Sequence, residues 1–316
     1  MIRTAEVVTP KHPDKICDRI SDAILDECLK QDPDTRSAIE TMGGHGIITV
    51  TGELTTKAYV DVQSIVKDVY GKDIGVQTNI VRQSSEISQG VDTGGAGDQG
   101  IMIGYACNDN EEYVPEEYFQ ARKLAQFIYN EYPYDGKTQV TTNGNSLRVV
   151  SSFQNTPTKE LEDMCTTFFR YTDYKIENLH CNPAGDWSLG GFDADAGLTG
   201  RKLAVDNYGP RVPLGGGAFS GKDASKVDRS AAYMARYIAV DLLKRHDAKE
   251  VFVQLAYAIG YDKPIQASAT IDGEIVPFLK GYDLSPNGII KLLDLKQPNF
   301  SKTAEWGHMG NNFKWL

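Results

Sequence analysis

The sequence repeats one order of predicted elements three times, and this repeat constrains the possible fold more than any other feature. Each unit has a helix, then two strands joined by a turn, then a second helix. Ile16, Ile20 and Ile24 predict the first helix, because four-residue spacing places them on one face, and Asn143-Gly144 is a strong hairpin turn. The predicted elements are helix 14–30, strands 37–42 and 47–54 and helix 62–69; helix 115–131, strands TQVTT and SLRVVSSF and helix 158–170; and helix 225–245, strands 250–260 and 264–271 and helix 287–295.

Three such units predict an α+β fold in which sheets pack through their helices, with pseudo-threefold symmetry. No low-complexity linker separates the units, so we expect them to be intertwined. Glycine-rich stretches at 90–100, 185–200 and 209–221 lie between the predicted elements, where functional residues are usually found. The expected domains are an N-terminal domain over 1–88, a central domain over 89–187 and a C-terminal domain over 188–316.

The composition excludes several classes of protein. Hydrophobic residues make up 41% of the 316 residues, which allows a sizeable core and excludes global disorder. The formal net charge of −10 argues against a protein that coats nucleic acid or an anionic membrane. Five scattered cysteines favour a reducing compartment, and the chain has neither an apolar run of ~18 residues nor the apolar core of a signal peptide. We therefore expect a cytoplasmic protein with no nucleic-acid or membrane partner.

The first glycine-rich motif, Gly94 to Gly100, contains G-x-G-x-x-G but does not predict a dinucleotide site. That interpretation requires a strand before the motif and a helix after it, whereas a polar stretch precedes this one and strand-like IMIGYA follows it. What remains is a loop whose backbone can approach a ligand closely, with the carboxylate of Asp98 in its middle.

The second motif, GGGAFSGKD over 215–223, is close to a phosphate-binding P-loop. Gly216, Gly221 and Lys222 match that pattern, but Asp223 stands where Ser or Thr would ligate magnesium, and two prolines precede the motif. A P-loop phosphotransferase is therefore disfavoured. A glycine loop that leads into a helix amino terminus still favours anions.

Basic residues gather at the same place. Lys222, Lys226 and Arg229 have the spacing of one helix face, and their charge at the start of a helix opposes the helix dipole. The sequence therefore predicts a strongly negative ligand there. A solvated basic face is the alternative interpretation.

Three carboxylates are candidates for binding a metal ion together with phosphate. Asp14, Asp98 and Asp228 lie beside glycine or basic residues, and magnesium that carries phosphate needs hard oxygen ligands. A helix cap or a surface charge would explain each of them taken alone.

A histidine and two glutamates complete the candidates. His12 stands at the start of the first helix, where it could donate a hydrogen bond to a phosphoryl oxygen or could be structural. Glu40 and Glu53 lie in the two predicted strands of the first unit, and each is either exposed at an edge or a buried ligand for a cation.

Several of these segments together resemble the methionine adenosyltransferases, the enzymes that make S-adenosylmethionine. The similar segments are HPDKICDRISDAILD, GAGDQGIMIGYA, GLTGRK and GGGAFSGKDASKVDRSAAYMARY, and matches extend from Glu6 to His308. The resemblance implies three intertwined α+β domains related by pseudo-threefold symmetry. It also implies a homodimer with active sites between its two subunits, and in some family members two dimers pair into a tetramer.

The resemblance further implies the reaction. The thioether sulfur of L-methionine attacks C5′ of ATP and expels the triphosphate, which is then cleaved to pyrophosphate and phosphate. Two magnesium ions per site and potassium assist. Thioether sulfur carries no proton and needs no general base, so the site must supply an in-line geometry and stabilise charge on the departing triphosphate.

The family's site residues carry over to this chain by position. The catalytic positions correspond to His12, Lys137, Arg201 and Lys222. The ATP-binding positions correspond to His12, Lys137, Trp187, Asp195, Arg201, Lys202, Ala218 and Lys222. The methionine-binding positions correspond to Glu53, Gln83, Asp98, Asp195 and Lys226. The metal positions correspond to Asp14 and Asp228 for magnesium and Glu40 for potassium, with Glu6 in the same motif region.

The chain departs from the family pattern at several positions. Lys11 stands where the family has glycine, Asp186 replaces a basic residue near adenine, and Asn311 stands at a usually basic place. The stretch from Gln83 to Asp98, which corresponds to the active-site loop, is shorter than usual and predicts weaker gating. These departures leave one alternative open, a non-catalytic homologue that binds ATP or a partner and regulates a catalytic subunit.

Overall fold

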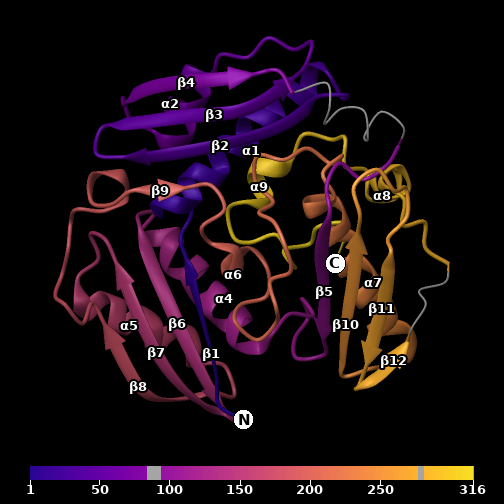
Figure 1. Ribbon diagram of the computed structural model, residues 1–316. Coiled ribbons are helices and arrows are strands. Elements are labelled where there is room, and N and C mark those ends of the chain that lie inside the picture. The colour runs from indigo at the N-terminus through magenta and orange to yellow at the C-terminus, as the bar shows by residue number, and fades with distance from the viewer. Residues whose placement is uncertain (84–93, 277–280, 316) are drawn as a thin grey trace.

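The computed structural model describes residues 1–83, 94–276 and 281–315 (Figure 1). The strands are β1 (Arg3–Val8), β2 (Arg36–Gly44), β3 (Ile47–Thr55), β4 (Gly75–Val81), β5 (Gly100–Cys107), β6 (Gly136–Asn143), β7 (Ser146–Phe153), β8 (Lys175–Cys181), β9 (Gly197–Leu198), β10 (Glu250–Tyr257), β11 (Gln266–Ile271) and β12 (Glu274–Val276). The helices are α1 (Pro13–Gln31), α2 (Val62–Tyr70), α4 (Glu116–Glu131), α5 (Thr158–Phe169), α6 (Leu203–Asp206), α7 (Val227–His246), α8 (Pro286–Leu293) and α9 (Phe300–Thr303), with the 3-10 turn η1 (Gly191–Asp193).

The three helix–hairpin–helix units predicted from the sequence are present. The first is α1, β2–β3 and α2, the second is α4, β6–β7 and α5, and the third is α7, β10–β11 and α8. Each hairpin forms the middle of a four-stranded sheet, in the orders β9-β2-β3-β4, β1-β6-β7-β8 and β5-β10-β11-β12. Figure 1 shows these sheets arranged around the centre of the molecule. The predicted α+β class is confirmed.

The units are intertwined because each one gives an edge strand to another. The strand that precedes α1 is β1, and it pairs with β6 of the second unit. The strand that precedes α4 is β5, and it pairs with β10 of the third unit. The strand that precedes α7 in the third unit is β9, and it pairs with β2 of the first. This cyclic exchange ties the units together, and the domain boundaries after residues 88 and 187 stay a prediction.

The first helix begins and ends where the sequence indicates. Pro13 occupies its first turn, where a missing N–H costs nothing, and the cap residue His12 accepts a hydrogen bond from the N–H of Asp14. Ile16, Ile20 and Ile24 are buried against Ile39 of β2. The apolar face of α1 therefore fixes the position of its amino terminus relative to the first sheet.

One face of the sheet β9-β2-β3-β4 is covered by helices and the other is open. The residues on the open face alternate along each strand with buried ones such as Ile39, Ile48 and Val50. Four of its large apolar side chains are well exposed, namely Met42 (50%), Ile47 (48%), Val81 (56%) and Leu198 (39%). An exposed apolar face of this kind is typical of a surface that a partner covers.

In the described part of the chain, no helix has both the length and the apolar character needed to cross a membrane. All five cysteines are buried and free of disulfide bonds. The thiol of Cys181 donates a hydrogen bond to Sγ of Cys165 at 4.0 Å.

Candidate active site

His12 is held as a neutral side chain at the amino terminus of α1. Its Nδ1 accepts the N–H of Asp14 at 3.2 Å, so the proton of the neutral ring is on Nε2. Burial, together with the positive charge of Lys202, lowers the pKa of His12 to about 4. At pH 7 the ring therefore presents Nε2–H as a hydrogen-bond donor without carrying a charge.

Asp14 links α1 to the segment that follows β9. Its Oδ1 accepts the N–H of Leu198 at 3.0 Å, and its Oδ2 accepts Nζ of Lys202 at 2.5 Å. The Nε of Arg201 lies 3.8 Å from Oδ1. Burial alone would raise the pKa of Asp14, but the hydrogen bonds from Lys202 and Leu198 hold it below its usual value. Asp14 is therefore an anion, and Arg201 and Lys202 both face it.

Lys137 approaches the same place from the second sheet. It lies on β6, and its Nζ is 3.4 Å from Oε1 of Glu6 on the neighbouring strand β1. The charge of Lys137 lowers the pKa of His12 and the charge of Asp195 raises it, so both residues lie near the ring. Together, His12, Asp14, Lys137, Asp195, Arg201 and Lys202 are called the first cluster below.

Lys222 and Asp228 form the centre of another charged group. Their Nζ and Oδ2 atoms are 2.9 Å apart, and both side chains are largely buried. A Cβ added at Gly217 would lie 2.7 Å from Oδ1 of Asp228, so the glycine loop closes tightly over the carboxylate. Gly100, two residues after Asp98, also borders Asp228.

Two further sequence-predicted residues lie on the open face of the sheet β9-β2-β3-β4, and a third follows its strand β4. Glu40 is on β2, where loss of solvent raises the pKa of its carboxyl group and the nearby positive charge of Lys222 opposes this rise. Glu53 on β3 pairs with Ala38, two residues from Glu40 and therefore on the same face. Gln83 follows β4, and its N–H donates to Thr55 Oγ1 at 3.2 Å, while its buried Oε1 has no partner. The residues Glu40, Glu53, Gln83, Asp98, Lys222 and Asp228 are called the second cluster below, and in the described part of the chain only Glu40, Lys222 and Asp228 of this set interact directly.

The prediction that Lys222, Lys226 and Arg229 form one stripe on a helix is wrong. Helix α7 begins at Val227, so Lys222 precedes it and Lys226 is its cap residue. Arg229 is fully buried and contacts Asp22 through both terminal nitrogens, at 2.6 and 2.8 Å. Its charge is therefore already neutralised inside the protein and does not face a ligand.

Lys226 and Ala218 lie at the borders of the second cluster. The Nζ of Lys226 is 2.6 Å from Oδ1 of Asp223, which also accepts the N–H of Ser37. Ala218 lies against Gly200, because a Cβ added at that glycine would come within 2.6 Å of the Cβ of Ala218. The glycine loop therefore touches the segment that carries Arg201 and Lys202.

The departure at Asp186 has a structural explanation. Oδ1 of Asp186 accepts the N–H of Thr158 at 2.9 Å and its Oγ1 at 2.5 Å, so this carboxylate caps the amino terminus of α5. The neighbouring Trp187 donates from Nε1 to Ser152 Oγ at 3.1 Å. Trp187 is thereby held against the sheet β1-β6-β7-β8, which also carries Lys137.

We expect the substitution Asp186→Ala to lower the midpoint of thermal unfolding, because the first turn of α5 loses the acceptor for its Thr158 N–H. Asp163→Ala is the matched control, since Asp163 is an exposed acid on the same helix. A calorimetric scan of both variants tests this expectation. Equal midpoints for the two variants would contradict the capping role.

The two magnesium candidates, Asp14 and Asp228, lie in different clusters. Within the ranges that the structure describes, no three His, Cys, Asp or Glu side chains gather into a metal site. Each aspartate instead contacts a lysine. This arrangement suits magnesium, which binds through one or two carboxylates and completes its shell with water and substrate phosphate.

Four buried aspartates of α1 form one row, of which only the first was predicted, and the first three contact segments that carry site residues. Asp14, Asp18, Asp22 and Asp26 repeat every four residues, and all of them are buried. The repeat is visible in the sequence, but charged residues on one helix face ordinarily indicate a solvated surface. Nothing in the spacing indicates that backbone N–H groups from distant segments cover this face.

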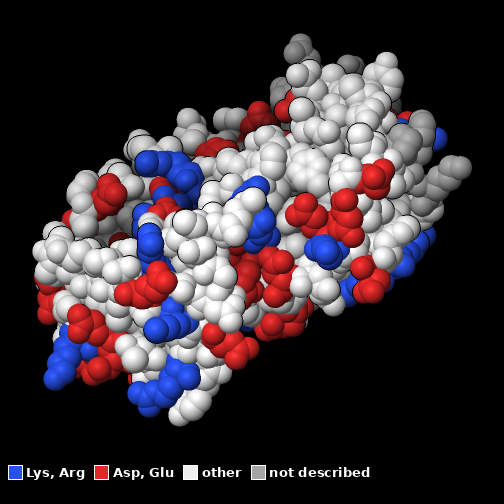
Figure 2. Space-filling view, turned by 90° about the horizontal axis from the view of Figure 1, so that it is seen from below, with Lys and Arg blue, Asp and Glu red and all other residues white. Residues whose placement is uncertain are grey.

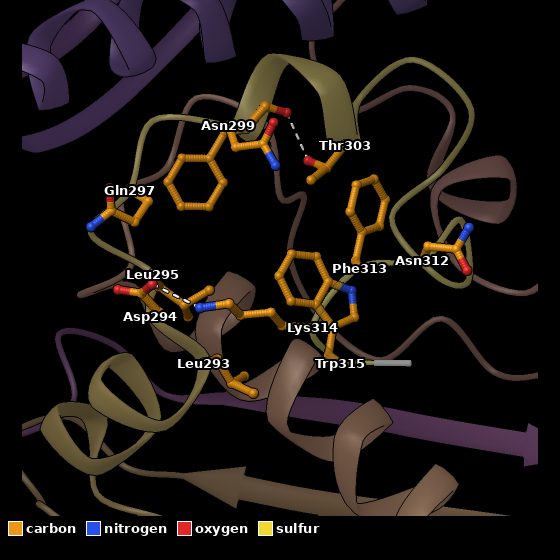
Figure 3. Close-up of a pocket in the computed structure, with 11 residues that line it drawn as sticks. Leu293, Asp294, Leu295, Gln297, Asn299, Thr303, Asn312, Phe313, Lys314 and Trp315 are labelled. Carbon is orange, nitrogen blue, oxygen red and sulfur yellow. Dashed lines mark hydrogen bonds and ion pairs between the residues drawn. The ribbon is translucent and has the colours of Figure 1, made fainter.

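Cavities also lie outside both clusters. One, of about 440 Å³, is lined by Lys11, whose Nζ is 3.5 Å from the carbonyl oxygen of Tyr70. Another, of about 190 Å³, lies between α9 and the end of the described chain, and Phe313 and Trp315 point into it (Figure 3). The shortened loop predicted to gate the site falls mainly on residues 84–93, outside the described residues.

Comparison with known proteins gives one consistent assignment. Family profiles of S-adenosylmethionine synthetase match the N-terminal domain at residues 1–92, the central domain at 93–163 and the C-terminal domain at 189–316. An S-adenosylmethionine synthase from Clostridium tetani (strain Massachusetts / E88) is 41% identical over 97% of this chain and 93% of its own length. One from Brachyspira hyodysenteriae (strain ATCC 49526 / WA1) is 39% identical over 99% of this chain and 94% of its own length. The chain therefore belongs to the S-adenosylmethionine synthetase family.

Proposed function

We propose that the chain forms S-adenosylmethionine from ATP and L-methionine in a single displacement at C5′ of the nucleotide. The family assignment makes the enzyme a transferase of S-adenosylmethionine biosynthesis. The proposal adds the atoms and residues. A lone pair of the methionine sulfur forms the S–C5′ bond while the C5′–O5′ bond breaks, and the triphosphate leaves with the electron pair. The triphosphate is then hydrolysed to pyrophosphate and phosphate.

The observation that carries this proposal is the gathering of fixed donors and cations in the first cluster. Lys202 and Arg201 face Asp14, and Lys137 lies near the ring of His12. Charge that develops on a leaving triphosphate is stabilised best by groups that are already in place before the reaction. We propose that the Nε2–H of neutral His12 donates to the leaving oxygen, and that Lys137, Arg201 and Lys202 bind the phosphates.

The second cluster supplies the remaining roles in this proposal. Lys222 binds the triphosphate, while Glu53, Gln83 and Asp98 hold methionine, together with Asp195 of the first cluster and Lys226. Trp187 stacks on the adenine, and Ala218 borders the nucleotide. The carboxylates of Glu53 and Asp98 have the charge needed to hold the ammonium group of an amino acid.

Magnesium and potassium have proposed positions in this arrangement. Asp14 and Asp228 would hold two magnesium ions, which neutralise phosphate charge when bound. Glu40 would contact potassium, and Glu6 lies beside Lys137 in the first cluster. Because Lys202 and Lys222 contact the two aspartates, these lysines must turn toward phosphate when metal binds.

We propose a homodimer in which each site takes one cluster from each subunit. Two observations support this. Among the described residues, no hydrogen bond or ion pair joins the first cluster to the second. The open face of β9-β2-β3-β4, which carries Glu40 and Glu53, exposes Met42, Ile47 and Val81. A second copy that covers this apolar face would bring its own first cluster to the edge of the same sheet. Size-exclusion chromatography would show separately whether two dimers pair into a tetramer.

A cytoplasmic enzyme without nucleic-acid or membrane partners is the setting that we propose. Figure 2 shows one face of the molecule, on which acidic and basic side chains are interspersed. The formal net charge of −10 and the five free cysteines agree with this setting.

The activity is tested by incubating the chain with ATP, L-methionine, Mg²⁺ and K⁺. We expect S-adenosylmethionine to form together with equal amounts of pyrophosphate and phosphate, and we expect a chelator of Mg²⁺ to abolish the reaction until Mg²⁺ is restored. Release of all three phosphates distinguishes the reaction from that of a kinase. Binding of ATP without any S-adenosylmethionine would instead support the non-catalytic alternative.

A further inference from the structure

Helix α1 contacts both charged clusters through one row of carboxylates. Asp14, Asp18, Asp22 and Asp26 are four residues apart, so they extend along about 18 Å of the helix. Each accepts at least one backbone N–H from a segment far away in the sequence. Buried carboxylates are unfavourable unless they are paired or hydrogen-bonded, so these contacts are needed for the row to be inside the protein at all.

The first two carboxylates hold the segment that delivers two basic residues of the first cluster. Asp14 accepts the N–H of Leu198 at 3.0 Å, and Asp18 accepts the N–H of Gly200 at 2.8 Å. Between them, the hydroxyl of Thr199 is 2.8 Å from that of Ser21, one turn further along α1. Arg201 and Lys202 come directly after this held segment, so its position sets where their side chains begin.

The third carboxylate holds the loop that delivers the lysine of the second cluster. Oδ1 of Asp22 accepts the N–H of Gly221 at 2.8 Å, immediately before Lys222. Gly221 has a φ of +82°, and a Cβ there would lie 1.9 Å from the carbonyl oxygen of Ile39. The loop is therefore fixed by α1 on one side and by β2 on the other.

The fourth carboxylate has the same kind of contact but leads to no residue of either cluster. Asp26 accepts the N–H groups of Phe300 and Ser301 at 2.7 and 2.9 Å, at the start of α9. It is nearly as buried as the others, at 7% exposure. Asp26 is therefore a natural control for the three that precede it.

We infer that Asp18 and Asp22 are positioning residues for the proposed reaction: Asp18 fixes the backbone before Arg201 and Lys202, and Asp22 fixes the backbone before Lys222. This inference rests on the proposed function, because it assigns a catalytic consequence to the placement of those three basic residues. A displacement of about 1 Å in such groups costs roughly 10²-fold in rate. Neither aspartate touches substrate in this account, and each acts through the backbone of a loop.

Asp18 uses both of its carboxyl oxygens, so an amide of the same shape cannot keep both contacts. Oδ2 of Asp18 accepts Nζ of Lys15 at 3.0 Å, and Lys15 also contacts Oδ1 of Asp206 at 2.5 Å. Lys15 is fully buried. After the substitution Asp18→Asn only one side-chain atom can accept, and the buried ammonium would attract it. The NH₂ group would then face the N–H of Gly200, and the segment before Arg201 would lose its anchor.

The test compares Asp18→Asn with Asp26→Asn in the full-length protein, with kcat and KM for ATP and methionine measured per folded molecule. We expect Asp18→Asn to lower kcat about 10²-fold and to leave the KM for methionine unchanged, because Arg201 and Lys202 are proposed to contact the triphosphate and not methionine. We expect Asp26→Asn to lower stability toward urea and to leave kcat unchanged. Equal kcat values for the two variants would overturn the inference.

A second variant keeps the inference testable if Asp18→Asn does not fold. Combining Lys15→Met, Asp18→Asn and Asp206→Asn neutralises the whole buried trio, and such replacements are often tolerated. With Lys15 gone, the amide oxygen at position 18 is free to accept Gly200 N–H, so kcat is expected within about tenfold of the unsubstituted protein. A folded triple variant that has lost kcat about 10²-fold would overturn the inference.

The parallel assay of the unsubstituted chain separates the two proposals. Product formation by that chain together with full kcat in Asp18→Asn would contradict the positioning role alone. Absence of product from the unsubstituted chain would contradict the proposed function and the positioning role with it.

Discussion

Replacing Lys222 by alanine is expected to lower kcat by about 10²–10³-fold, which corresponds to about 2.7–4 kcal/mol of lost transition-state stabilisation. The Nζ of Lys222 is held 2.9 Å from Asp228 in a loop that glycines pack tightly around it. Because the loop backbone is fixed, only the side chain of Lys222 has to turn when metal and triphosphate bind, and the cation is then in place before charge gathers on the leaving group. We expect the same range for Lys137→Ala, since Lys137 has the corresponding role in the first cluster.

The control for this prediction is Lys30→Ala. Lys30 is 58% exposed and pairs with Glu27 at 2.7 Å on the surface of α1. Such pairs contribute little, so this variant should keep both its stability and its kcat. Far-ultraviolet circular dichroism and urea unfolding establish that the Lys222 and Lys137 variants are folded. Turnover of a folded Lys222→Ala variant at the unsubstituted rate would refute its assignment to the site.

Removal of the buried guanidinium in Arg229→Met is expected to lower the free energy of unfolding by about 3–5 kcal/mol. Arg229 forms a paired contact with Asp22, donates from Nε to the hydroxyl of Tyr233 at 3.0 Å, and stacks on Phe300 at 4.0 Å. The substitution leaves the carboxylate of Asp22 buried without its cation. It also removes the donor to the carbonyl oxygen of Lys222, at 3.0 Å.

Urea unfolding of Arg229→Met beside Arg245→Ala measures this effect. Arg245 is 64% exposed and lies 2.9 Å from Asp241, and its loss is expected to change stability by less than about 0.5 kcal/mol. Equal unfolding midpoints for these two variants would show that the buried pair contributes no net stability.

The elements of the fold could be predicted from the sequence because they depend on local patterns. The four-residue spacing of Ile16, Ile20 and Ile24 and the turn Asn143-Gly144 each specify their own structure. The exchange of edge strands could not be predicted in the same way. Strand β9 has two residues, Gly197 and Leu198, and only its pairing with distant β2 makes it a strand.

The composition of the site was accessible from motifs, but its division into two clusters was not. Family motifs identify which residues carry charge, while the contacts of Lys222 depend on where the chain turns before α7. The carboxylate of Asp223 accepts the N–H groups of Ser37 and Ser225, and this turn delays the helix until Val227. Helical spacing therefore misplaced Arg229, whose buried partner Asp22 lies on α1, far away in the sequence.

The most direct test of the account is complementation between two inactive variants. If each site takes the first cluster from one subunit and the second from the other, a dimer of one Lys137→Ala subunit and one Lys222→Ala subunit has one site with both substitutions and one site with neither. Random assembly of equal amounts should therefore recover about one quarter of the unsubstituted activity. Activity that stays at the level of the separate variants, in a mixture shown to contain mixed dimers, would contradict a site shared between two subunits.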